Sequence, residues 1–276
     1  MRHTRQHVGQ ALGGAADLRH FCASLGVFFR VPEQGMKEYN ILARATITPV
    51  LHSKGWERLR FLAPAHTVSP WAFKKVYPKP WLSFVDETHV KYFMEIRDPK
   101  DGAVLASYRL TGPVQHPTRD LAALRLAHEK DALEDVRKRR FPFHPSKLRD
   151  RPLQTGEEVR VVGYEVVEPP PSGPAVVAGD HSFCEDPNML MVDTNGGLTA
   201  RTPRQAFLWT DTPLNPGMCG SAILDESLEC CGCVEGVVPP KPVGEDLSEA
   251  YRLIEGNACF IESPDIARFL EDEEVA

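Results

Sequence analysis

The sequence of 276 residues has no apolar stretch long enough to cross a membrane. A spanning helix needs about 20 largely apolar residues, and charges, prolines or glycines interrupt every apolar run here. The sequence also lacks a dense basic block, because the formal net charge is -6 and the longest basic run is the four residues at 137–140. We therefore expect no contact with a membrane and none with nucleic acid, and we place the basic run on a solvated helix face.

The cysteines do not form a regular framework. There are seven, an odd number, and Cys230, Cys231 and Cys233 crowd one short segment, which is a poor basis for paired disulfides. A structural zinc site would need a second cysteine pair elsewhere, and none is present. We interpret the cluster as a strand and turn with small buried side chains. No metal or other cofactor is predicted, and a reducing, intracellular setting fits best.

The N-terminus has no apolar core ahead of a cleavage-like site, which argues against a secretory signal. Arg2, Arg5 and Arg19 with Asp17 as the sole acid give it a faint likeness to an organellar presequence. The expected location is cytoplasmic, with organellar targeting as the alternative.

The chain divides into four predicted segments. Apolar residues at three- and four-residue steps, from Leu18 to Phe29, predict an amphipathic helix in an N-terminal arm over 1–36. Short β-rich runs fill 37–128, and a charged helix with a connecting strap follows over 129–151. A second β-rich block over 152–276 contains a flexible PPPSGP stretch and ends in a helix with Ser263, Pro264 and Asp265 at its start. This spacing predicts an all-β protein of the barrel or sandwich type.

One segment carries the strongest chemical signal. In NPGMCGS at 215–221, two glycines bracket Cys219, and glycine permits the sharp turns that present backbone amides. The segment resembles the nucleophile turn of the chymotrypsin-like peptidases, Gly-x-Ser-Gly-Gly, or Gly-x-Cys-Gly-Gly/Ser in viral cysteine versions. The longer string TDTPLNPGMCGSAILD is similar to the Asp-x-x-x-Asn-Pro-Gly-Asn-Ser-Gly-Gly-Pro-Leu segment of the HtrA-like branch, with cysteine in place of serine.

Two further motifs match the same family. FLAPAHTV at 61–68 resembles the strand that ends in Ala-Ala-His or Asn-Ala-His, and RDLAALRL at 119–126 resembles the Asp-Leu-Ala-Leu-Leu strand. The resemblance implies two six-stranded antiparallel β-barrels of the chymotrypsin type. It also implies a triad in which Cys219 attacks, His66 is the base and Asp120 orients the imidazole.

The resemblance assigns further residues to the site. The backbone amides of Gly217 and Cys219 would stabilise the oxyanion. A polypeptide substrate would bind along Val234 to Val238, and no acidic residue guards the predicted pocket, so we expect a small or medium apolar residue before the scissile bond. The predicted substrate-binding residues are Thr212, Pro213, Gly236, Val237, Val238, Asn257 and Ala258.

Alternatives remain for each residue. Cys219 could be an inert buried thiol and His66 a core histidine, while Asp120 could pair with Arg119 or Arg125. Asp98 and Asp101 are competing acids. The alternative function is a catalytically inactive pseudopeptidase that binds peptides along its cleft. Oligomeric state is open.

Overall fold

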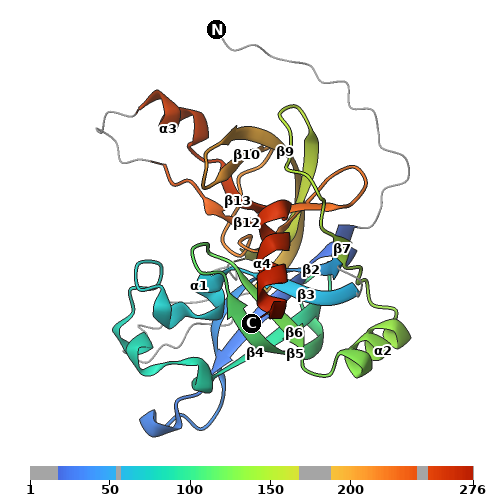
Figure 1. The fold of residues 1–276 in the computed structure, drawn as a ribbon. Coiled ribbons are helices and arrows are strands. Elements are labelled where there is room, and N and C mark those ends of the chain that lie inside the picture. Colours follow the sequence, from blue (N-terminus) through green and yellow to red (C-terminus); the bar gives the residue numbers. More distant parts are fainter. Residues whose placement is uncertain (1–17, 54–56, 168–187, 241–247, 276) are drawn as a thin grey trace.

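A computed structural model describes residues 18–53, 57–167, 188–240 and 248–275. Two β-barrels lie one above the other, with the C-terminal helix along their side (Figure 1). The predicted PPPSGP stretch and residues 1–17 of the N-terminal arm lie outside the described residues.

The first barrel is a closed antiparallel sheet in the order β1-β4-β5-β6-β3-β2, because β1 also pairs with β2. A short β7 extends the sheet in parallel to β2. Valine, isoleucine, leucine and phenylalanine fill the strand positions that face the barrel core. Successive side chains of a strand point to opposite faces, so alternate positions supply this core. The strands are β1 (Ala23–Phe29), β2 (Asn40–Ser53), β3 (Glu57–Ala63), β4 (Val90–Arg97), β5 (Val104–Gln115), β6 (Ala122–Leu126) and β7 (Ser146–Lys147).

The second barrel closes in the order β10-β13-β12-β11-β8-β9, with every pair antiparallel. Its strands are β8 (Glu158–Val167), β9 (Asn188–Arg201), β10 (Ala206–Thr210), β11 (Ala222–Leu224), β12 (Cys230–Val237) and β13 (Ala258–Glu262). The prediction of an all-β protein with two six-stranded antiparallel barrels is confirmed.

The predicted N-terminal amphipathic helix is wrong. Leu18–Phe21 form one 3-10 turn, η1, and Ala23–Phe29 form β1 between β2 and β4. Almost every residue of β1 is buried, because both faces of the strand are covered. Apolar residues therefore do not alternate with polar ones along it. The spacing of apolar residues alone cannot distinguish a short buried strand from a buried helix. Here, hydrogen bonding to β2 on one edge and β4 on the other makes the segment a strand. The first barrel therefore begins at Ala23 and not at residue 37.

The helices are few and mostly short. The charged segment forms α2 (Glu129–Arg139), whose basic last turn is exposed as predicted. The C-terminal helix α4 (Ser263–Val275) is also present. The others are α1 (Ala65–Val68), α3 (Glu249–Ile254), η2 (Pro32–Gln34), η3 (Pro70–Ala72), η4 (Pro80–Phe84) and η5 (Glu87–His89). No helix in the described ranges is long and apolar enough to cross a membrane.

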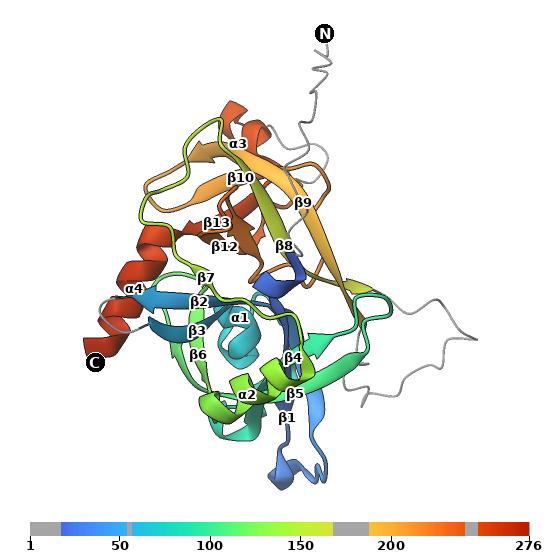
Figure 2. The ribbon, with the colours of Figure 1, turned by 90° about the vertical axis from the view of Figure 1, so that its right-hand side faces the viewer.

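A shared apolar cluster joins the two barrels. Leu62 and Leu121 of the first barrel pack in one cluster with Val162 of the second and with Ile266 and Phe269 of α4. Figure 2 shows α4 running from the level of β13 past β3, alongside both barrels. The interface therefore fixes how the loops of one barrel face those of the other.

Candidate active site

The pairing of β3 with β6 places His66 beside Asp120. Ala63 pairs with Ala122, so the end of β3 lies next to the start of β6. His66 follows in the one-turn helix α1, and Asp120 precedes β6. One carboxylate oxygen of Asp120 accepts the backbone N–H of His66 at 2.8 Å, and the other bonds to the ring Nδ1. Asp120 therefore holds both the backbone and the imidazole of His66.

Cys219 comes from the second barrel and meets the same histidine. It lies in the turn that leads into β11, half-buried, and its side chain is hydrogen-bonded to His66. The structure thus brings together the three side chains that the sequence predicts as a triad.

The electrostatics of His66 favour its protonated form. The ring packs near Phe73 and Tyr77, at centroid distances of 6.3 and 6.1 Å. Burial by itself lowers its pKa, but the hydrogen bonds to Asp120 and Cys219, with their charges, outweigh burial and raise the pKa to about 9. At neutral pH this imidazole carries a proton beside the Cys219 sulfur.

The turn around Cys219 depends on two glycines with positive φ. Gly217 has φ 98° and Gly220 has φ 88°. A Cβ at Gly217 would lie 2.8 Å from the Tyr164 carbonyl oxygen, and one at Gly220 would overlap the Thr46 carbonyl oxygen. Both positions therefore need glycine for conformation and for space.

We expect Gly220→Ala to destabilise the protein by about 3 kcal/mol or more, from backbone strain together with a clash against the backbone of β2. Gly156 is the matched control, since it has the same φ of 88° but no atom within 4 Å of the position that a Cβ would take. Gly156→Ala should cost about 1 kcal/mol. Urea denaturation of both variants measures the difference, and equal losses would contradict the close approach at Gly220.

The first barrel anchors the Cys219 turn. The Thr46 N–H on β2 donates to the carbonyl oxygens of Gly217, at 2.9 Å, and Cys219, at 3.1 Å. The Thr46 hydroxyl donates to the Gly217 oxygen at 3.0 Å and accepts the Tyr164 N–H at 2.7 Å. The turn is therefore held by backbone and side-chain contacts from the opposite barrel.

The predicted oxyanion donors keep their hydrogens available. The carbonyl of Pro216 accepts from Val166, so the Gly217 N–H in the same trans peptide points the opposite way. In the described part of the chain, neither the Gly217 nor the Cys219 backbone N–H donates to a protein acceptor. Such amides can receive a developing negative charge.

The predicted substrate-binding residues fall into two places. Gly236 and Val237 end β12, where Val237 pairs with Ala258. Val238 follows the strand and donates its N–H to the Asn257 carbonyl. Val237 is 40% exposed and Ala258 is buried. The side chain of Asn257 bonds to Thr199. Thr212 and Pro213 are exposed, and the Thr212 N–H donates to Thr194 of β9.

The other acids that the sequence offered for the triad have different hydrogen-bond partners. Asp98 and Asp101 accept backbone N–H groups within their own turn, at Lys100 and Ala103. Arg119 pairs with Glu235 of β12, at 3.1 Å. The family resemblance placed Glu235 only within the predicted substrate-pairing strand, and no sequence motif pointed to Thr46.

The cysteine cluster forms part of strand β12, as predicted. Cys230, Cys231 and Cys233 are buried, and all six cysteines of the described residues are free. Burial raises the pKa of Cys230 to about 12 and that of Cys231 to about 11. Within the residues that the structure describes, no group of three or more histidines, cysteines or acids is placed to hold a metal ion.

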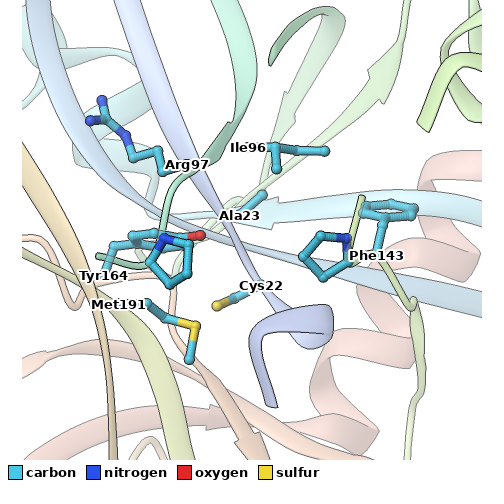
Figure 3. Close-up of a pocket in the computed structure, with 9 residues that line it drawn as sticks. Cys22, Ala23, Ile96, Arg97, Phe143, Tyr164 and Met191 are labelled. Carbon is cyan, nitrogen blue, oxygen red and sulfur yellow. The ribbon is translucent and has the colours of Figure 1, made fainter. Parts of the chain in front are cut away.

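A small cavity lies between the barrels (Figure 3). Neither His66 nor Cys219 lines it. Its volume is about 20 Å³, room for about one water molecule. Cys22 lines it, but burial raises the pKa of this thiol to about 12, which leaves it unreactive. The other lining residues are Ala23, Ile96, Arg97, Pro99, Pro142, Phe143, Tyr164 and Met191.

Comparisons with known proteins point to one family. Residues 84–232, more than half of the chain, match the family model described as "Trypsin-like peptidase domain". This range includes Asp120 and Cys219 and begins after His66. A search of curated proteins found no match.

Two solved structures are similar in outline. The active form of the Rv3671c protease from M. tuberculosis has 12% identity and a TM-score of 0.46, over 90% of this chain and 79% of that one. The serine endoprotease from Yersinia pestis has 15% identity and a TM-score of 0.48, over 92% of this chain and 64% of that one.

Proposed function

Because the chain belongs to the trypsin-like peptidase domain family, we propose that it is an endopeptidase that uses a Cys219–His66–Asp120 triad. The observation that carries this proposal is the position of His66, whose Nδ1 is bonded to Asp120 and whose imidazole also interacts with the Cys219 side chain. A nucleophile, a base and an orienting acid in that order are what covalent acyl transfer needs.

The proposed reaction has two steps. The Cys219 thiol gives its proton to His66, its sulfur attacks the scissile carbonyl carbon, and the amides of Gly217 and Cys219 stabilise the oxyanion. His66 then gives its proton to the departing amine, which leaves a thioacyl enzyme. In the second step His66 accepts a proton from water, the resulting hydroxide attacks the thioester, and Cys219 departs to regenerate the thiolate–imidazolium pair.

The proposed substrate is a polypeptide with a small or medium apolar residue before the scissile bond. Val237 at the end of β12 is exposed and offers an apolar contact, while Ala258, paired with it, is buried and brings no carboxylate to this position. Such a surface favours an aliphatic side chain over lysine or arginine, which would lack a charged partner.

Labelling with a peptide chloromethyl ketone tests the nucleophile and does not require the natural substrate. We expect one label, on Cys219, and at least about a tenfold lower rate in His66→Ala at pH 7, because an ordinary thiol is only a few per cent ionised there. The buried cysteines of β12 serve as internal controls. Labelling of Cys219 no faster than in urea-unfolded protein would instead support an inactive peptide-binding module.

A further inference from the structure

Glu235 occupies a β-bulge in β12. Val234 pairs with Phe260 and Gly236 pairs with Cys259, so Glu235 has no residue directly opposite on β13. A bulge redirects a side chain, and bulges are common next to active sites. Here the carboxylate is 12% exposed and contacts the first barrel.

Three residues donate four hydrogen bonds to this carboxylate. Its Oε1 accepts the backbone N–H of Asp120 at 3.0 Å and Nε of Arg119 at 3.4 Å. Its Oε2 accepts from Nη2 of Arg119 at 3.1 Å and from Nε2 of Gln205 at 2.8 Å. Arg119 and Asp120 belong to the first barrel, whereas Gln205 belongs to the second, so Glu235 links the two.

The bond to Asp120 matters because of what Asp120 holds. The same residue that donates its backbone N–H to Glu235 uses both carboxylate oxygens on His66. Hydrogen bonds to an ionised carboxylate are roughly twice as strong as neutral ones. Loss of this anchor would free the segment that enters β6, and an imidazole displaced by about 1 Å can lose a factor of about 100 in rate.

We propose that Glu235 is a positioning residue of the active site, which fixes Asp120 from the opposite barrel and so keeps His66 aligned with Cys219. The proposal rests on the proposed function for its effect on catalysis, but its effect on His66 can be measured in a protein without activity. The ionisable groups that face Glu235 are Arg119, Asp120, His116, Cys233 and Cys259.

Glu235→Ala should lower kcat by about 10- to 100-fold with little change in KM. NMR titration of the His66 ring gives the second measurement. We expect its midpoint to fall from about 9 toward the ordinary histidine value, because Asp120 no longer holds the ring. Glu262→Ala is the matched control, since Glu262 is 14% exposed and pairs with Arg201 in the same barrel. This control should leave both quantities unchanged.

Two further variants separate positioning from general destabilisation and from charge. In an Asp120→Asn background, Glu235→Ala should cause no further fall in the His66 midpoint, because its effect acts through Asp120. Glu235→Gln keeps an oxygen that can accept the Asp120 N–H, and should retain a midpoint close to the wild-type value. An additional fall in the double variant, or equal falls in the alanine and glutamine variants, would overturn the proposal. An inactive wild-type protein with the expected titrations would refute the peptidase and not the positioning role.

Discussion

Replacing Cys219 by alanine is expected to lower kcat for peptide hydrolysis by about a million-fold, as loss of a nucleophile does in other triad enzymes. The sulfur is the atom that attacks in the proposed mechanism, and no other described cysteine is hydrogen-bonded to His66. Fold stability should change little, because Cys219 is only half-buried. The measurement is release of product from a fluorogenic peptide library, with circular dichroism to confirm folding.

Cys22→Ala is the control for this experiment, because it removes a fully buried thiol that lies away from His66. It should retain hydrolysis at close to the wild-type rate. If Cys219→Ala cleaves peptides as fast as the wild type does, Cys219 is not the nucleophile.

Asp120→Asn should lower kcat by about 10⁴-fold, the loss seen when the orienting carboxylate of a triad becomes an amide. An asparagine can offer its oxygen to only one of the two His66 donors that Asp120 now binds. The imidazole then loses both its fixed tautomer and the carboxylate that stabilises its charge. Asp98→Asn, at the competing acid, should leave kcat unchanged, and equal losses in the two variants would remove Asp120 from the triad.

Asp120 also links folding to pH. The pKa of His66 is about 9 in the folded protein, above its ordinary value of 6.5, so the folded state binds this proton more tightly. The contribution of this proton to the free energy of unfolding is complete below about pH 6.5 and is lost as the pH rises toward 9. In Asp120→Asn the pKa of His66 falls, so the free energy of unfolding should decline less over this interval, as measured by urea denaturation.

The candidate site could be predicted from the sequence where short local motifs determine the backbone conformation. The Cys219 turn needs glycines for positive φ, and the structure has them at Gly217 and Gly220. The segments that contain His66 and Asp120 became adjacent because β3 and β6 pair. Strand patterns were sufficient to predict two β units, and the cap and proline at Ser263 and Pro264 predicted the C-terminal helix.

Contacts between distant segments could not be predicted from those patterns. The residues of β1 look helical in isolation and become a strand because β2 and β4 pair on either side. Thr46 is an ordinary strand residue in the sequence, yet it binds a turn more than 170 positions away. Glu235 reaches Asp120 only because a bulge turns it toward the other barrel.

The anchoring of the Cys219 turn by Thr46 has a consequence for biosynthesis. The barrel that carries Thr46 and His66 leaves the ribosome first, and the turn that carries Cys219 follows later and must dock onto it. Neither half, expressed as a separate polypeptide, contains all three of His66, Asp120 and Cys219. With the proposed triad, a nascent chain would gain peptidase activity only after both halves have emerged and joined, and mixing the two fragments in trans should restore the docked turn.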